Sequence, residues 1–128
     1  EGLDVEGDPT VDFTETHQVI VNVGHAQGCE VARKLEESNI IVNYQAIPRD
    51  QGFTCSSALR LGVSEMTRFG MDEADFQAFA PLLAEAIRTE KPISEKVAAF
   101  RQGFRTMRYC FDGDVPESLR EKVAQTLL

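Results

Sequence analysis

The stretch Asn39–Gly70, NIIVNYQAIPRDQGFTCSSALRLGVSEMTRFG, decides the fold that this sequence predicts. Residues 40–45 are predicted to form a strand, and residues 57–63 have the apolar alternation that is typical of strands. Pro48 and Gly52 lie between them and favour a turn, because proline presets one backbone dihedral and glycine permits unusual ones. A connection this short joins antiparallel neighbours, so the stretch predicts two paired strands.

Arg60 is the candidate functional residue of this stretch. Alternate residues of a strand share a face, so Leu59 and Leu61 are expected to point into the core and Arg60 away from it. Its neighbours on its own face, Ala58 and Gly62, are small and leave open space above it. A planar guanidinium in such a space can bind a carboxylate through two parallel hydrogen bonds. The alternative is an ordinary strand arginine whose charged end lies in water.

Length and composition indicate a single folded domain of 128 residues. The net charge of −8 disfavours nucleic acid and anionic membranes as partners, because binding to phosphates depends on lysine and arginine. No apolar run approaches the roughly 20 residues of a membrane span, and no signal peptide opens the sequence. The odd number of well-separated cysteines, Cys29, Cys55 and Cys110, favours reduced thiols in a cytoplasmic protein.

The rest of the chain completes an α+β domain. A strand is predicted at residues 17–23, and helices are predicted at residues 29–37, 72–88, 94–109 and after Pro116. Pro81 is expected to kink or split its helix, because it removes one hydrogen bond and clashes with the preceding turn. Residues 1–13 are acidic and are predicted to be a connector from a missing large domain, which leaves residues 14–128 as the domain itself.

The expected architecture is a small, mainly antiparallel sheet of three to four strands, covered by helices on one face. The other face would carry Asn43, Gln45 and Arg60 and would be open to a partner.

Several kinds of chemistry have no support in the sequence. His17 and His25 have no cysteine or carboxylate at a recognisable metal-ligand spacing. No nucleophile–base arrangement can be identified. The arginines at 101, 105 and 108 favour a solvated or acid-paired helix face over an RNA contact in a chain this acidic. None of the four lysines has the position of a desolvated Schiff-base lysine, so the chain alone is predicted to lack a complete active site.

The motifs at residues 16–21, 39–48, 57–62 and 66–70 together resemble the C-terminal domain of serine hydroxymethyltransferase. The runs THQVIV at 16–21 and NIIVNYQAIP at 39–48 resemble two of its strands. The runs SALRLG at 57–62 and MTRFG at 66–70 are similar to its arginine-containing signature, and the helix at 72–88 also fits. The resemblance covers about residues 13–90.

The resemblance implies a pyridoxal-phosphate enzyme with the aspartate-aminotransferase fold. The missing large domain would supply the Schiff-base lysine and hold the cofactor, and the parent enzyme would be a homodimer or tetramer. Arg60 matches the family arginine that binds the carboxylate of glycine or serine. Asn43 and Gln45 would lie on the folate side of the site.

The chain departs from the family pattern on that folate side. Gln45 stands in place of an asparagine that contacts folate, Tyr44 replaces a common lysine, and Ala58 replaces a glycine. Residues 63–65, Val-Ser-Glu, replace Thr-Pro-Ala. These changes put tetrahydrofolate use in question, so an aldolase or transaldolase acting on β-hydroxy amino acids is an alternative.

Two other classes of protein fit the composition and the periodicity. A free-standing regulatory module that binds an amino acid would bind its ligand as the 128-residue chain alone. A structural or dimerising domain would form a tight oligomer that is indifferent to Arg60→Ala.

Overall fold

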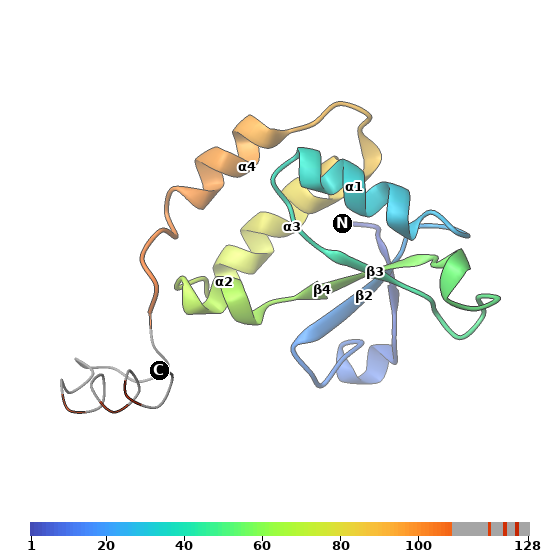
Figure 1. Cartoon of the computed structure of the whole chain (residues 1–128), viewed down its shortest axis with the longest axis horizontal. Coiled ribbons are helices and arrows are strands. Elements are labelled where there is room, and N and C mark those ends of the chain that lie inside the picture. Colours follow the sequence, from blue (N-terminus) through green and yellow to red (C-terminus); the bar gives the residue numbers. More distant parts are fainter. Residues whose placement is uncertain (109–117, 119–121, 123–124, 126–128) are drawn as a thin grey trace.

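The computed structural model describes residues 1–108, 118, 122 and 125, and it has a four-stranded antiparallel sheet with helices packed on one side (Figure 1). The strands are β1 (Asp4–Glu6), β2 (Gln18–Asn22), β3 (Asn43–Gln45) and β4 (Ala58–Gly62), in the spatial order β1-β2-β4-β3. The helices are α1 (Gly28–Glu37), α2 (Ser64–Arg68), α3 (Glu73–Arg88) and α4 (Ser94–Arg101), with 3-10 turns η1 (Pro9–Val11) and η2 (Phe53–Cys55). The predicted α+β class is confirmed.

The register of the sheet separates its residues into two faces. Leu59 of β4 lies opposite Val21 of β2 and Tyr44 of β3, and Leu59 and Val21 are buried. The next residue, Arg60, lies opposite Ile20 and Asn43 on the other face. Alternation along the strands therefore places apolar residues under the helices and leaves Arg60 on the open face.

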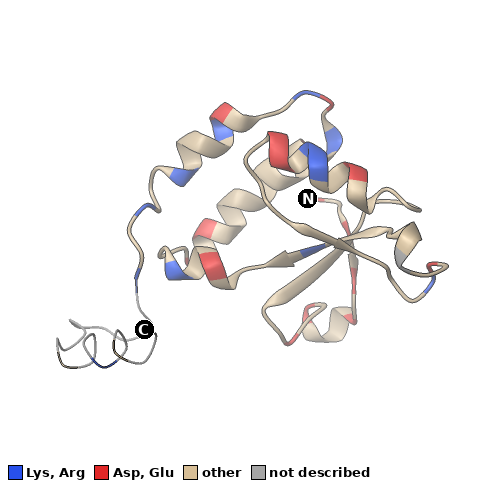
Figure 2. Ribbon diagram, in the orientation of Figure 1, with Lys and Arg blue, Asp and Glu red and all other residues tan. Residues whose placement is uncertain are grey.

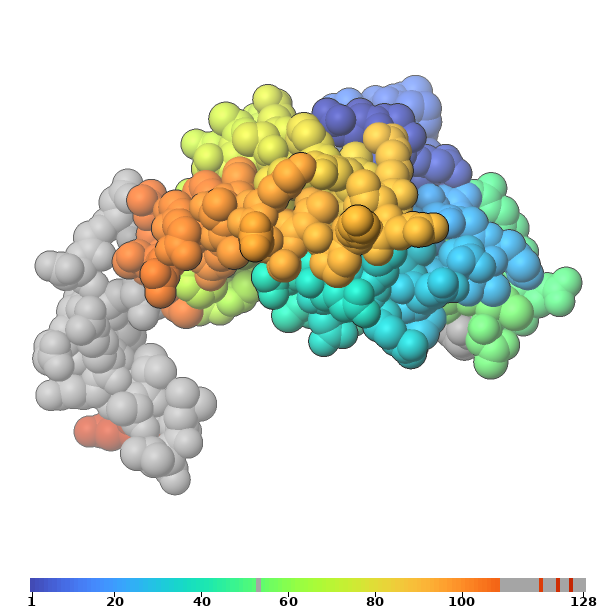
Figure 3. Space-filling model, turned by 90° about the horizontal axis from the view of Figure 1, so that it is seen from above, coloured from blue at the N-terminus to red at the C-terminus, as the bar shows by residue number. Residues whose placement is uncertain are grey.

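A single cluster of buried side chains joins the helices to the covered face of the sheet. It contains Ala32, Leu35, Ile40, Leu59, Leu83, Ala86, Ile93 and Val97. Leu35 of α1 and Leu59 of β4 are fully buried, and Leu83 and Val97 bring α3 and α4 into the same core. Viewed from this side, α1, α3 and α4 form one continuous surface (Figure 3).

The N-terminal residues contribute more structure than the sequence predicts. Residues 1–13 were expected to be a connector with weak structure of its own, but Asp4–Glu6 forms β1 and pairs with Asn22, Val21 and Ile20. The segment is too short and too acidic to show strand periodicity, and its pairing with β2 depends on contacts distant in sequence.

The predicted helix boundaries also need correction. The chain contains α2, which was not predicted, and α4 ends at Arg101 where the pattern predicted a helix to Tyr109. Gly103 follows this end closely, and glycine disfavours continuation of a helix. Pro81 lies inside α3, which continues through it without a split. Most of the predicted helix after Pro116 lies outside the described residues.

In the part of the chain that the structure describes, no helix combines the length and the apolar character that crossing a membrane requires.

Candidate functional site

Arg60 projects from β4 on the open face of the sheet and is exposed to solvent. It is the one basic residue in the four strands that the structure describes, and it is visible as a blue segment of β4 in Figure 2. Its side chain forms no ion pair or hydrogen bond with any described residue. The guanidinium therefore retains all of its donors for a ligand.

The predicted site residues Asn43 and Gln45 lie beside Arg60. Asn43 is directly opposite Arg60, and Gln45 is opposite Ala58 on the same face. A shallow hollow is lined by Asn43, Tyr44, Gln45, Ala46, Ser56 and Arg60. The structure thus brings together the three residues that the sequence selected.

The predicted open space around Arg60 is present on one side only. A Cβ added at Gly62 would meet nothing within 4 Å, whereas Ala58 is fully buried. The residue opposite Arg60 on β2 is Ile20, which is partly buried. A ligand at Arg60 would therefore be bordered by an apolar side chain on one strand and by an amide on the other.

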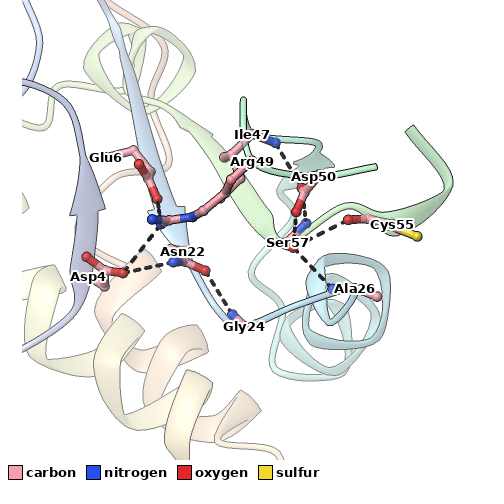
Figure 4. Close-up of polar contacts among 10 residues, drawn as sticks. All are labelled: Asp4, Glu6, Asn22, Gly24, Ala26, Ile47, Arg49, Asp50, Cys55 and Ser57. Atoms are coloured by element: carbon pink, nitrogen blue, oxygen red, sulfur yellow. Dashed lines mark hydrogen bonds and ion pairs between the residues drawn. The ribbon is translucent and has the colours of Figure 1, made fainter. Parts of the chain in front are cut away.

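The loop between β3 and β4 is organised around the Asp50 carboxylate (Figure 4). Its Oδ2 atom accepts from the backbone N–H groups of Ile47 and Ser57, both at 2.9 Å. The Ser57 hydroxyl donates to Oδ1 and accepts from the Ala26 N–H at 3.1 Å. Asp50 thereby joins its own loop to the start of β4 and, through Ser57, to the loop that precedes α1.

Opposing effects act on the pKa of Asp50. Partial burial raises the pKa, but hydrogen bonds from the Ser57 side chain, the Ile47 N–H and the Ser57 N–H lower it, and so does the charge of nearby His25. The net effect is a pKa below the usual aspartate value. These hydrogen bonds therefore stabilise the ionised carboxylate of Asp50, which is the form that accepts them.

Arg49 extends from the same loop toward the opposite edge of the sheet (Figure 4). Its guanidinium forms an ion pair with Glu6 of β1 and lies 4.0 Å from a carboxylate oxygen of Asp4. Asp4 also accepts a hydrogen bond of 2.8 Å from the Asn22 amide. The sequence interpretation missed Arg49 and Asp50, and the turn residues Pro48 and Gly52 were the only local signal for this loop.

The other residues considered from the sequence lie apart from Arg60 or serve structural contacts. His17 precedes β2, and its carbonyl accepts from the Val63 N–H, while His25 lies near Asp50. Cys29 and Cys55 are free thiols, and Cys110 lies outside the described residues. No group of three potential metal ligands is found among the residues that the structure describes.

The three arginines of the predicted stripe do not share one helix, because α4 ends at Arg101. The Arg101 guanidinium lies 4.4 Å from the centroid of the Phe69 ring, and Arg105 donates to Gln102 at 3.1 Å.

The lysines within residues 1–108 do not lie on the open face. Lys34 of α1 donates to the carbonyl of Ile87 at 2.8 Å, and Lys96 of α4 pairs with Glu85. Lys91 lies in the connection between α3 and α4. Within residues 1–108, the open face therefore carries the Arg60 guanidinium but no lysine amine beside it.

Comparisons with known proteins identify the family to which the chain belongs. The sequence pattern of the family described as serine hydroxymethyltransferase matches residues 8–83, which is more than half of the chain. The chain is 45% identical over 102 residues to serine hydroxymethyltransferase of Pyrobaculum calidifontis, covering 77% of the chain and 24% of the relative. It is 40% identical over 134 aligned residues to that of Pyrobaculum arsenaticum, covering 99% and 31%.

A solved structure is similar as well. The crystal structure of L-threonine transaldolase from Pseudomonas fluorescens superposes with a TM-score of 0.76 at 33% sequence identity, over 97% of this chain and 29% of that one. The chain thus spans about a quarter to a third of the length of the proteins it matches. The family match, which includes β4 and Arg60, and the similarity of the fold lead to one conclusion: this chain belongs to the serine hydroxymethyltransferase family.

Proposed function

We propose that this chain is the substrate-binding, C-terminal part of a pyridoxal-phosphate-dependent enzyme that forms or breaks the Cα–Cβ bond of glycine, serine or other β-hydroxy amino acids. The observation that carries the proposal is the free guanidinium of Arg60 on the open face of a domain of this family. Arg60 binds the α-carboxylate of the amino acid through paired hydrogen bonds.

The role of Arg60 is to fix the orientation of the substrate. A carboxylate held by two parallel hydrogen bonds cannot rotate freely, so the remaining bonds of the α-carbon take defined directions. Asn43 lies opposite Arg60 and offers an amide to the same ligand, and Ile20 borders it on the other side.

The cofactor belongs to the part of the polypeptide outside this chain. Pyridoxal phosphate needs a lysine partner, and Lys34 and Lys96 are engaged on the helical side of residues 1–108. When bound, the cofactor supplies an electron sink for the bond that is cleaved. This chain alone is therefore inactive, and its partner is the large domain of a cytoplasmic homodimer or tetramer.

A second candidate of the same kind is a transaldolase that does not use tetrahydrofolate. The similarity to L-threonine transaldolase favours it, because that structure matches 97% of the chain. Gln45 and Asn43, which line the hollow, are the residues that a folate would meet. A free-standing amino-acid-binding module remains the alternative outside enzymes, and it would require binding by the 128 residues alone.

The test is a titration of the full-length parent enzyme, loaded with pyridoxal phosphate, with glycine as the ligand. Glycine is expected to shift the absorption band of the cofactor. Arg60→Ala should weaken glycine binding by about 2–5 kcal/mol, because it removes one partner of a charge pair, and should leave cofactor binding unchanged. Arg33→Ala is the matched control, since Arg33 is exposed on the outer side of α1.

Equal glycine affinity in Arg60→Ala and the parent would show that Arg60 does not bind the substrate carboxylate. A parent protein that stays colourless after incubation with pyridoxal phosphate would favour the free-standing module. Repeating the glycine titration with tetrahydrofolate present distinguishes a hydroxymethyltransferase from a transaldolase that does not use folate. Only the folate-using enzyme should show a further spectral change.

A further inference from the structure

We infer that Arg49 is a positioning residue that keeps Arg60 available for its ligand by holding the carboxylates on the open face of the sheet, above all Glu6. This inference rests on the proposed role of Arg60 as the carboxylate-binding residue.

The first observation is the distribution of charge on the open face. By strand alternation this face carries Asp4 and Glu6 from β1 and Arg60 from β4, and the other residues that the four strands contribute to it are uncharged. Glu6 and Asp4 are thus the carboxylates of the strands themselves that could compete with a substrate carboxylate for the Arg60 guanidinium.

The second observation is that Glu6 and Arg60 lie in the same row across the sheet. Glu6 is opposite Ile20, and Ile20 is opposite Arg60. Their backbones are separated by two strand spacings, about 10 Å, which two long side chains can bridge. Ile20, which lies between them, is aliphatic, so it provides no polar group to pair with Glu6 or with Arg60.

The third observation is the position of Arg49. Its guanidinium is the only partner of the Glu6 carboxylate among the described residues, whereas Asp4 has a second one in Asn22. Asp50, the neighbour of Arg49, is fixed by its bonds to Ile47 and Ser57. The loop therefore presents Arg49 to β1 from an anchored backbone.

Removal of Arg49 would leave Glu6 without its counter-charge, in reach of Arg60. A Glu6–Arg60 pair would then compete with the amino-acid carboxylate. Pairs of this kind near a surface are weak, so we expect Arg49→Ala to weaken glycine binding about two- to fivefold. Arg49→Lys keeps the charge and should retain most of the affinity.

The experiment is a set of glycine titrations of the full-length enzyme loaded with pyridoxal phosphate, using the parent, Arg49→Ala, Glu6→Gln and the double variant. If Arg49 acts by holding the Glu6 charge, Glu6→Gln binds glycine at least as well as the parent. The double variant then regains the parent affinity, because no carboxylate at position 6 is left to compete.

A purely structural anchor predicts the opposite pattern. Both single variants would break the same contact, so Glu6→Gln would weaken glycine binding as Arg49→Ala does, and the double variant would not recover. That result, or unchanged affinity in Arg49→Ala, would overturn the inference. Failure of the proposed function is distinguishable, because Arg60→Ala would then leave glycine binding intact.

Discussion

At the scale of single residues, Asp50 shows how one carboxylate can hold a loop. It accepts hydrogen bonds from two backbone N–H groups and from the Ser57 hydroxyl, and it lies one residue from Arg49. Because its hydrogen bonds favour the charged form, the folded protein holds the pKa of Asp50 below its value in the unfolded chain.

The depressed pKa of Asp50 predicts an acid-sensitive contribution to stability. A group whose pKa is lower in the folded state stabilises the fold above the unfolded pKa, and this contribution is lost as the pH falls through the folded value. In urea unfolding, the parent should therefore lose more free energy of unfolding below about pH 4 than Asp50→Asn does. Glu37→Gln, at an exposed position of α1, is the control. Parallel pH profiles of the parent and Asp50→Asn would contradict this account.

Single residues also show which part of the candidate site the sequence predicts and which part it does not. Alternation within β4 was enough to predict that Arg60 faces away from Leu59, because that direction is a local property of a strand. The pairing of Arg49 with Glu6 spans 43 positions and depends on the strand order, which local patterns do not encode.

At the scale of elements, the start of α1 lies close to the backbone at the start of β4. Gly28 begins α1, and its N–H donates to the carbonyl of Ser56 at 2.9 Å. A Cβ at this position would lie 2.8 Å from the Ser56 oxygen and 2.9 Å from the Ala58 oxygen. Both atoms are backbone, so the helix itself would have to move.

Gly28→Ala should therefore destabilise the fold by about 1–3 kcal/mol, the usual cost of overpacking, even though alanine is the better helix former. Gly103→Ala is the matched control, because its Cβ would meet only the Phe100 carbonyl at 3.7 Å, an ordinary contact. The measurement is the free energy of unfolding in urea. A Gly28→Ala variant as stable as Gly103→Ala would show that α1 shifts without cost.

Elements with strong periodicity were predicted well, and short elements were not. The predicted strands at 17–23 and 57–63 and the helix at 29–37 correspond to β2, β4 and α1. The strand predicted at 40–45 is reduced to β3, and β1 and α2 were missed. β1 and β3 have three residues each, too few to show a period, and the five residues of α2 make little more than one helical turn, so tertiary contacts decide these elements.

At the scale of the whole molecule, the two faces of the sheet contribute unequally to stability. Its covered face contributes Leu59 to the cluster that unites α1, α3 and α4, so the free energy of folding comes mainly from that side. Its open face carries Arg60, which has no partner among the described residues and so contributes little to folding. Two consecutive residues of β4, Leu59 and Arg60, therefore differ in how much they contribute to folding.

This difference predicts opposite outcomes for two adjacent substitutions. Leu59→Ala removes a fully buried side chain from the core and should lower the free energy of unfolding by about 2–5 kcal/mol. Arg60→Ala removes an exposed side chain and should change it by no more than about 0.5 kcal/mol. Urea unfolding of the 128-residue chain, followed by far-UV circular dichroism, measures both values. A large loss of stability in Arg60→Ala would mean that Arg60 supports the fold, and a weakened glycine affinity in that variant would then no longer identify it as the carboxylate-binding residue.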